Sequence, residues 1–206
     1  MVSAVAILVI ILALAGVAAY FLWGSPGLAE RFLQRKSNGR RLQRKYGREY
    51  DRLYATHGDH AAVERELGRR ERDRRALTIA PVGPKERDRL TAEWTSAQAG
   101  FVDDPGRAAR RAEKLVGEAL AVRGYPADDP ERQLALASVD HAHSLSEFRD
   151  GHELLQRSNT GAPGVDATEQ LRQAMLHFRV FFDELVGGRT KAVAAVVVGG
   201  GEKVPA

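Results

Sequence analysis

Five side chains in the second half of the chain have the chemical types that bind metal ions or exchange protons near neutral pH. They are Asp140, His141, His143, His152 and His177. Imidazoles and carboxylates form metal sites when they converge on one point. In a regular helix, His141 and His143 diverge by about 200°, whereas His141 and His152 share a face but lie about 16 Å apart. The spacing favours histidines that are hydrogen-bonded or solvated, and it leaves a metal-dependent or pH-sensing protein as the alternative.

Two pairs of adjacent aspartates, in the sequence DDP at residues 103–105 and 128–130, could be paired catalytic carboxylates. Because an aspartate before a proline is also a helix-start signal, N-capping explains both pairs. The chain has no phosphate-binding loop, dinucleotide fingerprint or nucleophile elbow. It has no cysteine either, which excludes thiol catalysis and Cys-ligated zinc. We therefore expect no enzymatic activity and no cofactor.

Basic side chains are concentrated in the segment that follows residue 30, since residues 1–30 contain no Lys or Arg. Such a segment is attracted to anionic lipid headgroups by about 1 kcal/mol per charge. We expect seven of them to contact a membrane surface: Arg31, Arg35, Lys36, Arg40, Arg41, Arg44 and Lys45. The alternatives are charges that only set membrane topology, or nucleic-acid binding. Nucleic acid is the least favoured partner because no known nucleic-acid-binding module follows.

The N-terminus has the pattern of a transmembrane helix over residues 1–27. Residues 2–23 contain no charged side chain and end in Tyr20, Phe21 and Trp23. About 20 apolar residues span a bilayer, and aromatic rings favour its interface. A cleavable signal peptide would have a basic start and a shorter apolar core, so a secreted protein is the alternative. Because basic residues stay on the cytoplasmic side, we expect an outside N-terminus and a cytoplasmic C-terminal domain in the cell membrane.

Residues 28–80 form a basic juxtamembrane stem, expected to be helical in pieces that Gly39 and Gly47 separate. Residues 61–77 contain few large apolar side chains among many charges, which is typical of a solvated helix. A short coiled coil is possible there, although few core positions are apolar. The stem is basic as a whole: residues 24–80 carry 15 basic and 8 acidic side chains, whereas residues 81–188 carry 13 and 18.

Residues 81–188 have the pattern of a four-helix bundle, and the whole chain is predicted to be all-α. The expected helices run from about 85 to 101, from 105 to 123, from 130 to a loop at 158–165, and from 166 to 186. Each begins or ends at an aspartate, proline or glycine that favours a helix boundary. Apolar residues recur at helical spacing within each. The tail, residues 189–206, is expected to be disordered.

Several parts of the chain resemble a family of uncharacterised bacterial proteins over about residues 46–186. The resemblance rests on EWTSAQAGFVDDPGRAARRAEKLVGEALAVRGYP, SVDH, EFRDGHELL and TEQLRQAMLHFRVFFDELV. It implies a helical domain behind a variable N-terminal anchor. It implies no activity, because none is attached to the family.

These features together predict a single-span membrane protein that presents a cytoplasmic helical binding or scaffolding domain. Its expected partners are the lipid bilayer with its anionic headgroups and an unidentified protein. We expect that protein to bind the groove between the third and fourth helices of the bundle. Ala15 and Ala19 form a small-xxx-small pair, which can support a homodimer of the anchor.

Overall fold

The computed structural model describes residues 39–160 and 165–187. The chain divides into two compact units, residues 1–44 and residues 45–206. In the first unit, the described residues 39–44 are helical. All regular secondary structure in the described residues is helical, which confirms the predicted all-α class.

The predicted membrane anchor, residues 1–27, and the predicted disordered tail, residues 189–206, lie outside the described residues. Among the helices that the structure describes, none combines the length and the hydropathy needed to cross a membrane. Three of the predicted lipid-contacting residues, Arg31, Arg35 and Lys36, also lie outside them. The other four are exposed: Arg40, Arg41, Arg44 and Lys45.

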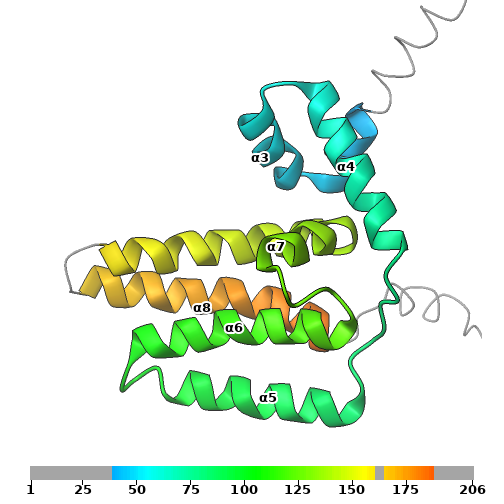
Figure 1. The fold of residues 1–206 in the computed structure, drawn as a ribbon. Helices are drawn as coiled ribbons and strands as arrows, with labels where there is room; N and C mark the ends of the chain where they lie inside the picture. Colours follow the sequence, from blue (N-terminus) through cyan, green and yellow to red (C-terminus); the bar gives the residue numbers. More distant parts are fainter. Residues whose placement is uncertain (1–38, 161–164, 188–206) are drawn as a thin grey trace, which may run out of the picture. The chain divides into compact units, whose positions relative to one another are not determined.

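Two helices, α3 (Arg48–His57) and α4 (His60–Arg75), form the first part of the second unit (Figure 1). Gly47, directly before α3, has φ 50°, a left-handed conformation that favours glycine. It separates α3 from the preceding helical residues, as the sequence predicts. Asp59 is the N-cap of α4, because its carboxylate accepts hydrogen bonds from two backbone N–H groups of the first turn at 3.1 Å.

The remaining helices follow the predicted order closely. They are α5 (Pro84–Ala99), α6 (Pro105–Arg123), α7 (Pro130–Thr160) and α8 (Val165–Val186). Asp104 caps α6 by accepting a hydrogen bond from the Arg107 N–H at 2.9 Å, and Asp129 accepts one from the Arg132 N–H at 3.0 Å. The aspartates before the two prolines therefore act as helix caps, as expected. Helix α7 continues through Thr160, so the loop before α8 is shorter than the predicted 158–165.

Helix α7 is bent at His141, whose φ of −130° and ψ of 35° are not helical. Two helical segments are joined there. We expected His141 and His152 to share one face of a regular helix. The bend corrects this expectation, because the backbone at His141 is not helical and the regular spacing of side chains does not continue through it. His141 pairs with Glu184 of α8, whereas His152 pairs with Glu113 of α6.

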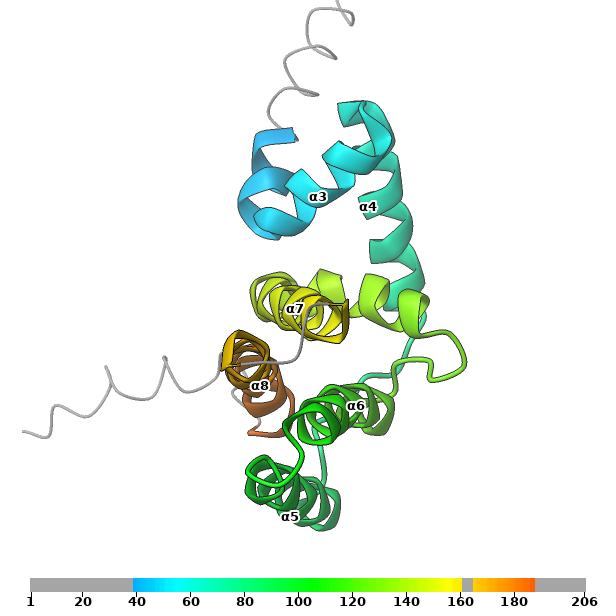
Figure 2. The same cartoon turned by 90° about the vertical axis from the view of Figure 1, so that its left-hand side faces the viewer.

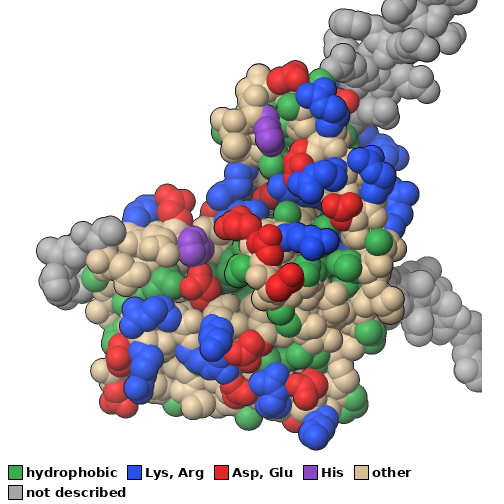
Figure 3. Space-filling view, viewed as in Figure 1, with side chains coloured by type: hydrophobic (Ala, Val, Ile, Leu, Met, Phe, Trp, Pro, Cys, Tyr) green, Lys and Arg blue, Asp and Glu red, His purple; other side chains and the backbone are tan. Residues whose placement is uncertain are grey.

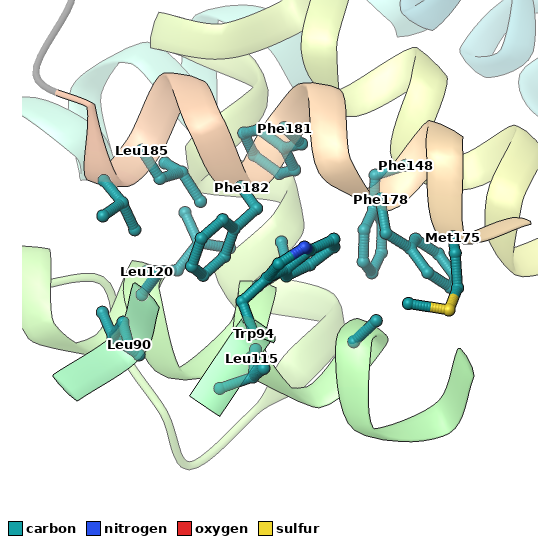
Figure 4. Packing of buried hydrophobic residues seen from close by; sticks show 14 of the residues in the cluster. Leu90, Trp94, Leu115, Leu120, Phe148, Met175, Phe178, Phe181, Phe182 and Leu185 are labelled. Atoms are coloured by element: carbon teal, nitrogen blue, oxygen red, sulfur yellow. The ribbon is translucent and has the colours of Figure 1, made fainter. Parts of the chain in front are cut away.

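The main hydrophobic core lies among α5, α6, α7 and α8, which Figure 2 shows nearly end-on. Trp94 stacks on Phe182 with ring centroids 4.5 Å apart, and Phe148 lies 5.3 Å from Phe178 (Figure 4). Aromatic pairs at these separations add about 0.5–1.5 kcal/mol beyond the burial of their area. Helix α8 supplies three of the six buried aromatic residues in this core, Phe178, Phe181 and Phe182, and contacts both α6 and α7.

Helices α3 and α4 pack against α7 and against one another. Val63 and Leu67 of α4 are fully buried, and Glu49 of α3 is only 1% exposed. The expectation that the charged segment 61–77 is a solvated stem is therefore corrected for one side of α4. The few large apolar residues of α4 lie on one face of the helix, so a narrow contact with the neighbouring helices is enough to bury them.

Candidate functional site

A groove lies between α6 and α7 and is called here the α6–α7 groove. Its volume is about 740 Å³, which lies within the range of small-molecule and peptide sites. Its lining includes small or apolar residues: Gly117, Ala121, Ala127, Pro130, Leu134 and Phe148. The groove therefore offers apolar surface to a bound ligand.

Local sequence explains why α6 and α7 leave this space. Gly117 and Ala121 lie one turn apart on α6, and neither has a side chain long enough to reach across. The side-chain amide of Gln133 on α7 spans the gap at one point by donating to the Gly117 carbonyl at 3.3 Å. The loop from Gly124 to Asp129 separates the two helices at the end of the groove.

Charged side chains of both signs surround the apolar interior. The basic ones are Arg52 of α3, Lys114 of α6 and Arg149 of α7, and the acidic ones include Glu118, Glu131 and Glu153. Figure 3 shows basic and acidic side chains interspersed over α6 and α7, with apolar side chains between them. Such a surface suits a ligand that has an apolar face flanked by charges of both signs.

Glu118 at the groove is held in its ionised form. Partial burial acts to raise its pKa, but hydrogen bonds and attraction from Arg111 and Arg89 lower the pKa below the ordinary value. Its carboxylate lies 2.6 Å from Arg111 and 3.5 Å from Arg89. Glu118 therefore stays ionised at neutral pH, and its charge is paired with Arg111 and Arg89.

His152 lies at the groove, where its Nδ1 pairs with the Glu113 carboxylate across from α7 to α6. The side chain of His152 is 50% exposed. It is therefore accessible to a bound ligand as well as to water. Within the predicted set of metal-binding and proton-exchanging residues, it is the one that lines this groove.

The other members of that set have separate partners. His141 is 9% exposed and lies 2.5 Å from Glu184 of α8, which also accepts a hydrogen bond from Ser144. The Nε2 atom of His141 is buried without a hydrogen-bond partner among the described residues. His143 is exposed, and the Nδ1 of His177 lies 2.9 Å from Glu147.

Asp140 belongs to a polar contact between α4 and α7. It accepts hydrogen bonds from the Tyr125 hydroxyl at 2.6 Å and from Arg74 of α4. Burial acts to raise the pKa of Asp140, but these two hydrogen bonds lower it below the ordinary value. Burial and the same carboxylate raise the pKa of Tyr125. The five predicted residues therefore do not meet at one point.

The groove expected between the third and fourth helices of the bundle, α7 and α8, is filled. Phe148, Phe178 and Phe181 pack there and are at most 6% exposed. Gly151 of α7 lets α8 approach closely, since a Cβ at this position would lie 2.8 Å from the Phe178 ring. The accessible groove lies instead between α6 and α7.

Sequence reasoning missed the carboxylates that pair with the histidines, namely Glu113, Glu147 and Glu184. Each comes from a different helix than its partner, so no local spacing relates the two. The sequence alone indicates only that Glu147 and the nearby Asp150 lie on the same face of their helix, because they are three residues apart.

Comparisons with models of protein families, with curated proteins and with solved structures find no match to this chain. The resemblance to a bacterial family over residues 46–186 therefore stays a prediction.

Proposed function

We propose that the chain is a membrane-anchored binding protein whose helical domain binds an amphipathic protein segment in the α6–α7 groove. The observation that carries this proposal is the groove itself, with its apolar interior and its rim of mixed charge. An amphipathic segment can lay its apolar face into such a groove while its charged residues pair with the rim. No catalytic step is part of the proposal.

The proposed anchor is the apolar segment 2–23, with the basic residues after it on the cytoplasmic side. Arg40, Arg41 and Arg44 support a role at the membrane surface, because their side chains are exposed and positively charged. Anchoring raises the local concentration of the domain near any partner at the same membrane. The domain then acts as a scaffold rather than as a freely diffusing receptor.

Crosslinking in cells followed by mass spectrometry tests both parts of the proposal. The full-length protein is compared with a version that lacks residues 1–27 and with Ala127→Arg, which places a large charged side chain in the groove. Ala127 is exposed, so this substitution leaves the core intact. Ala99→Arg adds the same charge at the exposed end of α5, away from the groove, and is the matched control.

We expect a discrete protein partner with the full-length protein and with Ala99→Arg, and at least about a tenfold loss with Ala127→Arg, typical of a disrupted hydrophobic anchor. Deletion of residues 1–27 is expected to move the protein out of the membrane fraction. Equal crosslinking of Ala127→Arg and Ala99→Arg would contradict the groove, and unchanged membrane fractionation of the deletion would contradict the anchor.

A further inference from the structure

Three side chains with metal-binding chemistry meet between α7 and α8, away from the α6–α7 groove. They are Glu147 and Asp150 of α7 and His177 of α8, and each offers one ligand atom within 4.8 Å of the other two. Each side chain is between 24% and 29% exposed. The cluster is therefore partly shielded from water but open to an ion from solution.

The backbone holds this cluster in place. Glu147 and Asp150 are three residues apart, so they share one face of α7. Between them and His177 lies the close approach at Gly151, where a Cβ would lie only 3.0 Å from the Cβ of His177. Glycine at this position lets α8 come near enough for His177 Nδ1 to lie 2.9 Å from Glu147. The three groups are thus positioned before any ion binds.

The cluster already attracts a cation that belongs to the protein. Arg48 of α3 donates to both oxygens of Asp150, at 2.5 and 2.7 Å. The Arg48 side chain is 63% exposed, and exposed ion pairs contribute little to stability. One guanidinium charge faces two carboxylates, so the site still carries an excess of negative charge.

We propose that Glu147, Asp150 and His177 bind a divalent transition-metal ion of the Zn²⁺ type, which takes the place of Arg48 on Asp150. An imidazole nitrogen together with carboxylate oxygens suits such ions, whereas Ca²⁺ and Mg²⁺ prefer all-oxygen sites. Three protein ligands complete most of a tetrahedral shell and leave one position to water. This site is independent of the proposed function, because none of its three ligands lines the α6–α7 groove.

Isothermal titration of the full-length, detergent-solubilised protein with Zn²⁺ tests the site. We expect one bound ion per chain and at least about a tenfold loss of affinity in His177→Ala and in Asp150→Asn, since each removes a ligand. His152→Ala is the matched control: it removes a histidine that also pairs with a glutamate but belongs to no such cluster among the residues that the structure describes, and it should retain the affinity. Circular dichroism of each variant shows whether it folds.

Arg48→Gln is expected to change the Zn²⁺ affinity in the opposite direction. This variant keeps all three ligands and removes the guanidinium that is hydrogen-bonded to both oxygens of Asp150, so the affinity should rise several-fold. The proposal is overturned if the wild-type protein fails to bind Zn²⁺ with a Kd below about 1 mM, a binding free energy of about −4 kcal/mol. It is also overturned if folded His177→Ala binds as the wild type does, or if Arg48→Gln leaves the affinity unchanged or lowers it.

Discussion

Helix α7 is attached to its neighbours in two different ways. Toward α8 and α6 it packs aromatic and aliphatic side chains, among them Phe148, which contacts Phe178 and Phe181. Toward α3 and α4 it is held by charged groups, with Glu49 of α3 buried between Arg70 of α4 and Arg149 of α7. The first contact has an aromatic centre that excludes water, whereas the second has buried paired charges at its centre.

The charged contact is nevertheless well buried. Arg70 lies 2.9 Å and Arg149 3.1 Å from the carboxylate of Glu49, and the side chains of the two arginines are only 10% and 16% exposed. A buried ion pair adds little net stability compared with an apolar contact of the same size, but breaking it leaves an uncompensated charge. The difference teaches that a charge-rich helix can belong to a folded domain when its charges are matched across the interface.

The largest expected effect comes from truncation of the aromatic contact. Phe178→Ala removes a fully buried ring of α8 and should lower the free energy of unfolding by about 4 kcal/mol, because a cavity remains in the core. Chemical denaturation followed by circular dichroism measures this loss. Val180→Ala on the same helix, where the side chain is 46% exposed, is the control and should change the free energy by less than about 0.5 kcal/mol.

The next largest effect is expected at the centre of the charged contact. Glu49→Gln removes the buried carboxylate that Arg70 and Arg149 share and leaves Arg70 only its pair with Glu66, which should cost about 3 kcal/mol in the stability of the α3–α4 attachment. Hydrogen exchange should show lost protection in α3 and α4 while α6 and α8 keep theirs. Asp51→Asn on the exposed side of α3 is the matched control. Uniform loss of protection in all helices would show that the two contacts are not separable.

Acid should weaken the charged contact before the aromatic one. A hydrogen bond from Lys45 lowers the pKa of Glu71, and hydrogen bonds from Tyr125 and Arg74 outweigh burial to lower that of Asp140. A carboxyl whose pKa is lower in the folded state stabilises the fold above its unfolded pKa. That stability is lost as the pH falls from about 4 through the folded pKa.

An acid titration of the amide NMR spectrum measures this order. Signals of α3 and α4 are expected to change at a higher pH than those of Phe178 and Phe182 in the aromatic contact. Asp140→Asn removes one of the responsible carboxylates and should flatten the pH dependence while lowering stability at neutral pH. A single transition in which all helices unfold together would contradict the prediction that the charged contact weakens before the aromatic contact.

The smallest expected effects come from two equivalent helix caps, one in each region. Asp59→Ala at α4 and Asp104→Ala at α6 each remove a carboxylate that accepts backbone hydrogen bonds, and each should cost about 1 kcal/mol. Hydrogen exchange is expected to show reduced protection in α4 for Asp59→Ala, and reduced protection throughout α5, α6, α7 and α8 for Asp104→Ala. Asp103→Ala, beside a cap but not acting as one, should cost less than about 0.5 kcal/mol.

Helix boundaries were predictable because their signals are local. Asp104 before Pro105 and Gly124 after α6 lie within a few residues of the backbone groups that they cap or turn. The apolar residues at helical spacing likewise predicted that α8 buries one side, and Phe178 and Phe182 lie on that side. Such features depend on chain neighbours, which the sequence lists directly.

Features that depend on distant residues were not predictable in the same way. Nothing near Glu49 indicates that Arg70 and Arg149 surround it, because its partners are 21 and 100 residues away. The bend at His141 and the space beside Gly117 also depend on how neighbouring helices pack. For this reason the predicted groove was placed between α7 and α8, where aromatic side chains fill the interface, rather than between α6 and α7.

The proposed binding function is tested most directly by a photo-crosslinking amino acid at residue 127, inside the α6–α7 groove, in the full-length protein in intact cells. The same amino acid at residue 99 reports contacts at an exposed position outside the groove. We predict a discrete crosslinked protein from position 127 and none of that mass from position 99. The same products from both positions, or none from position 127, would contradict the groove as the binding site.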